Sequence, residues 1–382
     1  MSERTLPYGS SATPSPTDAQ AIDAYRSFGT LRSSANGASL APEGDKRPLP
    51  QLVPAENLMA ERERAARTSA LLDELAALLG RLVLKGGSYS TTIPDLTITV
   101  RDHLNESACA VYDRAIGLMV SGRKCSVIGN RRYEYGRGDI LITTVDMPAL
   151  WQVLEASEAR PFMAVSVRLS EEILRDLTSS VEVSSDSAEA AREEKTDDLT
   201  DENVIPDTDT AHVAAASLTV TPPEMVDAYL RLVKLLEAPE EERREIAPLL
   251  IREIHYRALK SASGPALVQL FSRDSRANRI SRAVEWLREN FREPLSVTEL
   301  ADKVHMAPST FHRHFKAVTS LSPLQYHKRL RLHEARRLMM VEHVDAASAG
   351  FAVGYMSPTQ FSREYKRLFG APPKRSLEQR PE

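Results

Sequence analysis

The segment from Ser296 to Phe315, SVTELADKVHMAPSTFHRHF, places the tightest constraint on how this chain folds. Ser296 and Glu299 form an S-x-x-E capping box, which predicts a helix start because each side chain satisfies a free backbone N–H. A second helix is expected to begin at Pro308, since proline suits the first helical position. Phe311 and Phe315 lie four residues apart and therefore share one helix face. The segment thus predicts two short helices joined by a tight turn.

The opposite face of the second helix is polar and basic. A helix with an aromatic inner face and an outer face of hydroxyl, imidazole and guanidinium groups suits the major groove of DNA. An ordinary amphipathic helical hairpin has the same pattern, so a single copy does not decide between the two interpretations. The outward residues are Ser309, His312, Arg313 and Lys316.

The same pattern occurs a second time, from Asp345 to Tyr365. Phe361 stands where the first copy has Phe311, and a basic segment at 323–340 predicts one helix that connects the copies. Two helix-turn-helix units on one connecting helix can address successive segments of the major groove. The second copy points Thr359, Gln360, Ser362, Arg363, Lys366 and Arg367 outward, with Ser357 as its helix cap.

The charge distribution agrees with a C-terminal part that binds DNA. Residues 273–376 contain 19 Lys and Arg against 10 Asp and Glu, a net charge of +9. The whole chain carries −4, so the remainder carries −13. A basic module attached to an acidic remainder is the layout expected when only one part meets phosphate.

The types of the outward residues indicate different contacts. Arginine is suited to two hydrogen bonds with guanine, and His, Ser, Thr and Gln can add base contacts. Lysine and a hydroxyl at a helix start are better suited to phosphate. We expect base contacts from Ser309, His312, Arg313, Thr359, Gln360 and Arg363. We expect phosphate contacts from Lys316, Ser357, Lys366 and Arg367.

Residues 280–375 resemble the paired helix-turn-helix domain of the AraC/XylS transcriptional regulators. The family's SPxxY, RLxxA and F-x-R-x-(F/Y)-K-R-x-F-G elements correspond to Ser322–Tyr326, Arg331–Ala335 and Phe361–Gly370. Ala307 replaces the usual serine cap, which should cost about 1 kcal/mol at that helix start. Ala349-Gly350 replaces the usual Ile-Ala pair and predicts a thinner core in the second unit. We therefore expect the first unit to dominate specificity.

Upstream of this domain the apolar residues occur in short alternating runs. Many short strands separated by turn residues are typical of a sandwich or barrel. The stretch at 120–167 also resembles the N-terminal regulatory domain of one AraC subgroup, which is similar to a cupin jelly roll. The resemblance implies a small-molecule pocket inside a barrel. The predicted strands are 96–100, 108–113, 116–121, 124–128, 131–135, 139–144, 148–155 and 162–167.

The predicted barrel lacks the residues of a metalloenzyme. His103 is the only histidine in 96–169, whereas a three-ligand cupin site needs more imidazoles. A repair enzyme with a four-cysteine zinc site is disfavoured, because the chain has 2 Cys. We expect no catalytic residue, no metal site and no cofactor. Cys109 and Cys125, the latter close to Arg123, are candidates for effector binding or thiol-based sensing.

The fold class expected from these patterns is α+β and multidomain. A cupin-like β-barrel with flanking helices precedes an all-α domain with two helix-turn-helix units. Within the first of these, an acidic flexible insertion and a helical pair for dimerisation and coupling are expected at 178–212 and 222–260. The domains are a disordered extension at 1–60, the regulatory domain at 61–262, a linker at 263–276 and the DNA-binding domain at 277–376.

These features predict a sequence-specific DNA-binding transcription regulator, an activator rather than a repressor, located in the bacterial cytoplasm with the nucleoid. The expected partners are double-stranded promoter DNA, RNA polymerase, a small-molecule effector and a second copy of the chain. No apolar run is long enough to cross a membrane. The alternative is a DNA-binding module fused to a non-metal barrel that works as a protein-interaction module or a thiol-based stress sensor.

Overall fold

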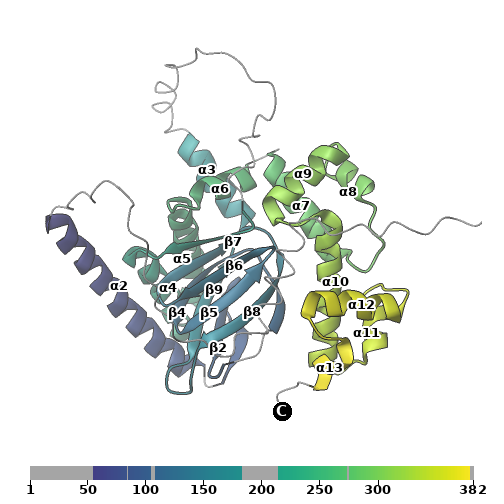
Figure 1. The fold of residues 1–382 in the computed structure, drawn as a ribbon. Coiled ribbons are helices and arrows are strands. Elements are labelled where there is room, and N and C mark those ends of the chain that lie inside the picture. The colour runs from purple at the N-terminus through teal and green to yellow at the C-terminus, as the bar shows by residue number, and fades with distance from the viewer. Residues whose placement is uncertain (1–54, 84, 105–107, 183–213, 273–274, 379–382) are drawn as a thin grey trace, which may run out of the picture.

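The structure is a computed structural model that describes residues 55–83, 85–104, 108–182, 214–272 and 275–378. An N-terminal part built on two β-sheets is followed by an all-helical C-terminal part (Figure 1). The expected disordered extension lies outside the described residues except for its end, where a helix begins at Ala55. Most of the acidic insertion expected at 178–212 also lies outside them.

All neighbouring strands in the two sheets are antiparallel. Sheet A has the strand order β1-β2-β9-β4-β7-β10, and sheet B has the order β3-β8-β5-β6. The strands of sheet A are β1 (Gly87–Ser90), β2 (Leu96–Arg101), β9 (Phe162–Arg168), β4 (Ala115–Ser121), β7 (Asp139–Thr143) and β10 (Ala216–Val220). Those of sheet B are β3 (Ala108–Tyr112), β8 (Met147–Glu155), β5 (Arg123–Ile128) and β6 (Arg131–Gly136).

The eight predicted strands are confirmed, each end within one residue of its expected position. The edge strands β1 and β10 were not predicted. In β10, Leu218 and Val220 are both exposed, so this strand has no buried apolar face. The expected cupin-like barrel takes the form of two facing sheets. Across the described residues, no strand pairing joins sheet A to sheet B.

Helices cover the face of sheet A that points away from sheet B. They are α2 (Ala55–Leu82), α4 (Pro223–Lys234), the 3-10 turn η2 (Leu235–Glu237) and α5 (Glu240–Leu259). The buried hydroxyl of Tyr229 on α4 donates a hydrogen bond of 2.6 Å to the carbonyl of Ile116, which fixes this layer on β4. Figure 1 shows α2 along the side of this layer.

Two further helices connect the parts of the chain. α3 (Glu171–Glu182) follows sheet A, and α6 (Gly264–Phe271) follows α5. The linker expected at 263–276 is therefore corrected, since more than half of it is helical. Leu267, Leu270 and Phe271 recur at helical spacing and are fully buried, so α6 is part of the core.

The C-terminal part consists of short helices arranged about one long helix. α10 (Pro323–Val341) separates the two predicted units, which lie toward its opposite ends in Figure 1. Its start carries a full capping box between Ser322 and Gln325. The other helices are α7 (Arg276–Glu289), α8 (Val297–Lys303), α9 (Pro308–Thr319), α11 (Ala346–Ala352), α12 (Pro358–Phe369) and α13 (Pro373–Glu378).

The two helix-turn-helix units relate differently to the sheets. One hydrophobic cluster runs from the sheets through α7, α8 and α9 as far as Tyr326 and Leu330 on α10. The second unit has its own smaller cluster, which includes Met339, Phe361 and Tyr365. The first unit is thus continuous with the core of the regulatory part, whereas the second packs mainly on α10.

Candidate nucleic-acid interface

The first unit forms the two helices and tight turn that its sequence predicts. The Ser296 hydroxyl caps α8 by accepting a 3.3 Å hydrogen bond from the backbone N–H of Glu299. His305 makes the turn with a left-handed backbone, at φ 55°. Ala307 precedes α9 without a side-chain cap, as expected. The ring of Phe315 is buried edge-on against Tyr326 of α10, with ring centroids 5.6 Å apart.

The outer face of α9 carries all the residues that were expected to meet DNA. They are exposed, while Phe311, His314 and Phe315 on the opposite face are buried. Two histidines flank Arg313 in the sequence. His312 is exposed beside it, whereas His314 is buried on the opposite face of α9. The exposed residues are Ser309, His312, Arg313 and Lys316.

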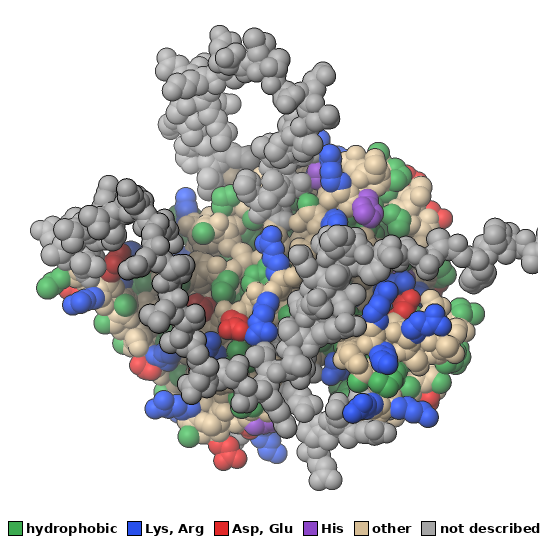
Figure 2. Space-filling view, viewed as in Figure 1, with side chains coloured by type: hydrophobic (Ala, Val, Ile, Leu, Met, Phe, Trp, Pro, Cys, Tyr) green, Lys and Arg blue, Asp and Glu red, His purple; other side chains and the backbone are tan. Residues whose placement is uncertain are grey.

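The second unit repeats this arrangement with better caps. The Asp345 carboxylate accepts hydrogen bonds from the backbone N–H groups of Ala347 and Ser348 at 3.0 and 3.1 Å. The Ser357 hydroxyl accepts one from the N–H of Gln360 at 3.4 Å, so this half-buried side chain is occupied at the helix start. The exposed residues of α12 include Thr359, Gln360, Arg363, Lys366 and Arg367. In Figure 2, Lys and Arg side chains gather over this unit.

The thinner core expected at Ala349-Gly350 is not what the structure shows. Ala349 and Phe361 are fully buried. A Cβ atom added at Gly350 would lie 3.0 Å from the Phe361 ring, which is closer than ordinary contact. The glycine therefore lets α11 approach α12 closely. The prediction of loose packing was wrong because it considered only the small volume of the two side chains. The shorter distance between the helices compensates for that volume.

Arg331 of α10 joins the second unit to the segment between α7 and α8 through its guanidinium. Its Nε donates to the carbonyl of Phe291 at 2.6 Å, and its Nη1 donates to the carbonyl of Gly354 at 3.1 Å. Its Nη2 donates to the carbonyls of Arg292 and Glu293, both at 2.8 Å. One side chain thereby ties the end of α7 to the turn of the second unit, a role that the sequence reasoning missed.

Glu364 fixes α12 against α10 from the inner side of the second unit. Its carboxylate accepts hydrogen bonds from Lys328 Nζ at 2.9 Å and from the Tyr355 hydroxyl at 2.8 Å. Burial by itself raises the pKa of Glu364, but the hydrogen bonds from Lys328 and Tyr355 outweigh it and leave the pKa below its usual value. Lys328 is thus engaged within the protein and is not part of the exposed basic face.

Polar contacts hold the helical part against sheet B. Arg288 of α7 donates to the Asp146 carboxylate at 2.5 Å and lies 2.6 Å from that of Asp113. The Tyr326 hydroxyl donates to the backbone carbonyl of Asp146 at 2.5 Å. Arg329 donates to the carbonyl of Gly129, also at 2.5 Å. The scaffold helix that carries both units is therefore anchored to the regulatory part.

Apolar contacts complete this interface. Leu368 and Phe369, at the end of α12, pack against Cys125, Val127 and Leu150 on the outer face of sheet B. His333 of α10 is buried beside β3, where desolvation lowers its pKa to about 3 and keeps the imidazole neutral. A cavity of 430 Å³ remains between β3 and α10, lined by residues that include Cys109, Arg288 and His333.

The two thiols lie in this interface, where the effect of burial on their pKa values outweighs that of the nearby arginines. Cys125 is fully buried, and burial raises its pKa to about 11. Burial also raises the pKa of Cys109. Arg123 pairs with Glu155 at 3.0 Å and with Glu134 at 3.6 Å. A reactive thiol requires a stabilised thiolate, so this geometry supports a packing role for both cysteines.

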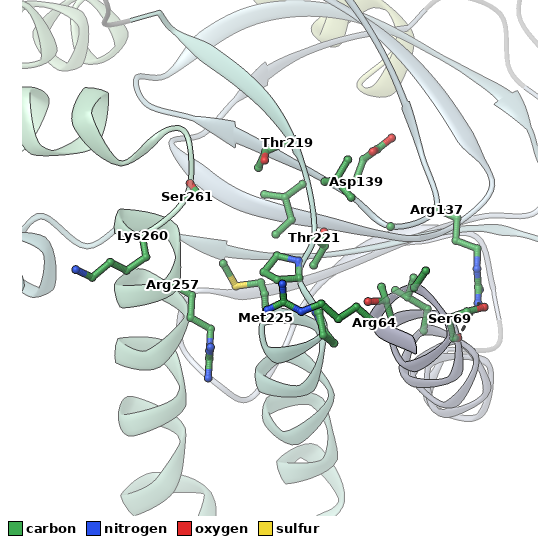
Figure 3. Close-up of a pocket in the computed structure, with 18 of the residues that line it drawn as sticks. Arg64, Ser69, Arg137, Asp139, Thr219, Thr221, Met225, Arg257, Lys260 and Ser261 are labelled. Carbon is green, nitrogen blue, oxygen red and sulfur yellow. Dashed lines mark hydrogen bonds between the residues drawn. The ribbon is translucent and has the colours of Figure 1, made fainter. Parts of the chain in front are cut away.

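A larger hollow lies on the other side of the molecule, between α2, α4, α5 and the edge of sheet A (Figure 3). Its volume is 960 Å³. Arg137 extends along its rim to donate to Asp73 and to the carbonyl of Ser69 on α2, at 2.8 and 2.9 Å. Met225 and apolar side chains of β7 line its floor, so the hollow is a surface depression between packed elements.

Two negative findings apply to the described residues. No group of three or more His, Cys, Asp or Glu side chains there is arranged to hold a metal ion. None of the helices in the described ranges is long and apolar enough to cross a bilayer.

Comparisons with known families divide the chain as the structure does. Residues 92–266 match the family described as the AraC-type transcriptional regulator N-terminus. Residues 300–379 match a helix-turn-helix domain family. The first match covers both sheets except β1, together with α3, α4 and α5, and the second runs from within α8 to α13. Neither family is one of enzymes.

Curated relatives match part of the chain. The transcriptional activator RhaS of Escherichia fergusonii is 32% identical over 96 residues, which are 25% of this chain and 34% of the relative. The transcriptional regulator ArgR of Pseudomonas aeruginosa is 31% identical over 102 residues, 27% and 31% of the two chains. The RhaS of Escherichia coli O1:K1 is 28% identical over 144 residues, 38% and 51%. The matched region thus spans between about a third and a half of these relatives.

Among solved structures, the crystal structure of ToxT from Vibrio cholerae aligns with 74% of this chain and 98% of its own, at 10% identity and a TM-score of 0.44. An AraC-type regulator from Chromobacterium violaceum aligns with 27% of this chain and 91% of its own, at 29% identity and a TM-score of 0.26. The two family matches, together with the paired units on α10, identify the chain as a member of the AraC/XylS family of transcriptional regulators.

Proposed function

We propose that this chain is a sequence-specific DNA-binding transcription regulator whose two-sheet part controls the helical part in response to a small molecule. One observation supports DNA binding above all others. Two helix-turn-helix units are fixed to one helix, and each keeps its polar and basic recognition face exposed. Arg331 links the segment before the first unit to the turn of the second, which favours a fixed arrangement for two successive groove segments.

The exposed faces divide into the two kinds of contact that DNA recognition uses. Arg313 and Arg363 occupy central positions on α9 and α12 and are assigned to base edges, with their exposed neighbours Ser309, His312, Thr359 and Gln360. Lys316, Lys366 and Arg367 lie one turn further along and are assigned to phosphates. Ser357, whose hydroxyl caps α12, is assigned to phosphate through its position at a helix N-terminus.

Sheet B supports control of DNA binding because its two faces have different neighbours. Its outer face carries the contacts with α10 and with the end of α12. Its inner face looks toward sheet A. A molecule bound between the sheets would therefore press on the same strands that hold the DNA-binding part.

Activation, rather than repression, is our proposed outcome, with promoter DNA and RNA polymerase as partners. The name of the relative RhaS, a transcriptional activator, supports this direction. We further propose that the chain acts as a homodimer through the layer formed by α4 and α5, where Leu249 and Tyr256 are exposed apolar residues. The chain is proposed to work as a regulator without an enzymatic activity or a cofactor.

Sequencing of the genomic fragments that the purified chain retains tests this function. A regulator enriches a small set of promoter fragments with a shared motif in two parts. The mobility shift of such a fragment should weaken steeply with salt, because phosphate contacts release counterions. Retention of fragments without any shared motif would refute sequence-specific regulation, and an absence of retention would favour a protein-interaction module.

A further inference from the structure

Several charged and aromatic side chains point into the space between sheets A and B. The guanidinium of Arg101 on β2 lies 5.6 Å from the centre of the Trp151 ring on β8. The ammonium of Lys124 on β5 lies 5.7 Å from the Phe162 ring on β9. Each of these contacts joins one sheet to the other. The inter-sheet space is therefore the volume onto which these four residues converge.

The wall of sheet A in this space consists of small side chains that are not packed as in a core. Thr99 pairs with Ala164, and Thr97 pairs with Ser166. Because every second residue of a strand points to the same side, both pairs share the face of sheet A that carries Arg101. All four are only half-buried. Strands β2 and β9 have neighbours on both sides, so the exposure comes from the inner face. Solvent therefore reaches the inter-sheet space, whereas the helix-covered face of the same strands is buried.

The opposite wall provides a flat aromatic surface. Lys124 lies over the ring of Trp151 at 4.4 Å and over that of Tyr112 at 5.1 Å. The hydroxyl of Ser126 is 2.8 Å from that of Tyr112 and 2.6 Å from that of Tyr135. This chain of three hydroxyl groups lies beside the cations and adds neutral hydrogen-bond donors to the same wall.

Among the described residues, the two cations make hydrogen bonds and ring contacts but no ion pair. Arg101 donates to its neighbouring carbonyl of Val100 at 2.7 Å and to the Ser88 hydroxyl at 3.3 Å. Neither Arg101 nor Lys124 forms an ion pair with a described residue. The exposed Asp102 next to Arg101 is instead hydrogen-bonded to His103 at 2.5 Å.

Arg101 and Lys124 are half-buried, and their partial desolvation is unfavourable. Desolvation and then the charge of Arg101 lower the pKa of Lys124 to about 7. Two neighbouring positive charges that are partly desolvated are stabilised by an anion, and a bound cation is excluded by repulsion. The aromatic and small apolar walls suit a flat organic body.

We propose that the inter-sheet space binds a small organic carboxylate, whose charged group lies between Arg101 and Lys124 and whose flat apolar body lies against Trp151. This inference rests on the proposed function and names the chemical class of the molecule that the two-sheet part senses. The carboxylate accepts hydrogen bonds from both cations. Ser126 on the inner face and Cys125 on the outer face are consecutive in β5, so occupancy reaches the surface that contacts Phe369.

The fluorescence of Trp151 provides a direct test. The chain has 2 Trp, and the full chain with Trp286→Phe leaves Trp151 as its single reporter. The probe is 3-phenylpropanoate, and its neutral counterpart is 3-phenylpropanamide. We expect a saturable change with the carboxylate and binding of the amide that is weaker by about tenfold or more, because the charge-assisted hydrogen bonds are lost.

Substitutions in the same background locate the site. Lys124→Met and Arg101→Met should each weaken binding of the carboxylate by about tenfold or more, and Lys124→Arg should retain more binding than Lys124→Met. Arg123→Met is the matched control, because Arg123 neighbours Lys124 in β5 but points to Glu155 on the surface. It should leave binding unchanged. Circular dichroism establishes that each variant is folded, and the Arg substitution keeps the test valid if the Met variant is not.

Three results would overturn the proposal: no saturable response to the carboxylate, equal binding of the amide, or unchanged binding by the Lys124 and Arg101 variants. Inorganic phosphate that binds as tightly as the carboxylate would also overturn it, since the apolar body would then contribute nothing. Promoter binding measured without any carboxylate separates this inference from the proposed function. DNA binding without a response to the carboxylate refutes only the proposed ligand class. A response to the carboxylate without DNA binding refutes the proposed function as a transcription regulator.

Discussion

Substitution of Gly354 with alanine should disrupt the second unit. The backbone of Gly354 is left-handed, at φ 89°. An alanine there costs about 1–2 kcal/mol from backbone strain alone. Its Cβ would also lie 2.2 Å from the carbonyl of Arg292 and 2.9 Å from Nη2 of Arg331, so one of these groups must move.

Movement of either group weakens the hydrogen bonds by which Arg331 holds the turn of the second unit to the segment between α7 and α8. A hydrogen bond from a charged group contributes about 1.5–3 kcal/mol, so Gly354→Ala should cost about 3–5 kcal/mol of unfolding free energy in total. His305 occupies the equivalent turn of the first unit and already carries a Cβ at φ 55°. His305→Ala is thus the matched control, with an expected change below about 1 kcal/mol.

Urea unfolding of the full chain measures both changes. A companion mobility shift compares duplexes that carry both halves of the motif with duplexes that carry the half bound by the first unit. Gly354→Ala should lose the advantage of the longer duplex and keep binding to the shorter one. A loss of stability no larger than that of His305→Ala would refute the reasoning about the turn and Arg331.

Three further predictions follow from the charges inside the protein. Lys124→Met should raise the free energy of unfolding by about 1 kcal/mol in calorimetry without ligand, because it removes a half-buried charge that forms no ion pair with a described residue. A decrease would contradict this. Arg288→Met should leave the buried Asp146 carboxylate without its cation. On heating, the regulatory part and the helical part should then unfold in separate transitions, whereas the parent protein shows one. A single unchanged transition would contradict the anchoring role of Arg288. The pKa of Glu364 is lowered on folding, so its stabilising contribution is complete above the ordinary glutamate pKa of about 4.3 and is lost as pH falls through the folded value. Glu364→Gln should therefore flatten the loss of stability in acid, and an identical acid profile would count against the pair with Lys328.

The sequence was sufficient for the elements whose apolar period is regular. The central strands of both sheets alternate clearly, and both helix-turn-helix units carry aromatic pairs at a spacing of four. The outward residues of α9 and α12 followed from the same periodicity, because a helix that buries Phe311 and Phe315 must expose Arg313. The left-handed turns at His305 and Gly354 lie where the pattern places a break.

Contacts between distant parts of the chain were beyond the sequence argument. The carboxylate of Asp146 meets Arg288 across 142 positions, and no local pattern marks such a pair. Lys124 lies between Arg123 and Cys125 in β5, and nothing in the sequence indicated a separate role for it. Its position between Trp151 and Arg101 depends on how two sheets face each other, which periodicity does not determine. The helix α6 was missed because its Gly-Pro start is also typical of a linker.

The roles assigned to the recognition helices can be tested through the base preferences of variants. Arg313→Ala should cost about 1–3 kcal/mol of binding at one base position and relax the preference there. Lys316→Ala, one turn further along the same exposed face, should weaken binding to all sequences alike and reduce its salt dependence. Arg363→Ala should cost less discrimination than Arg313→Ala if the first unit dominates specificity.

The measurement that bears most directly on the central claim is therefore the binding of Arg313→Ala to the selected promoter motif and to its single-base variants, side by side with Lys316→Ala. DNA reading by α9 predicts a loss confined to one base position for the arginine variant and a uniform loss for the lysine variant. An equal loss on every sequence for both variants would contradict it.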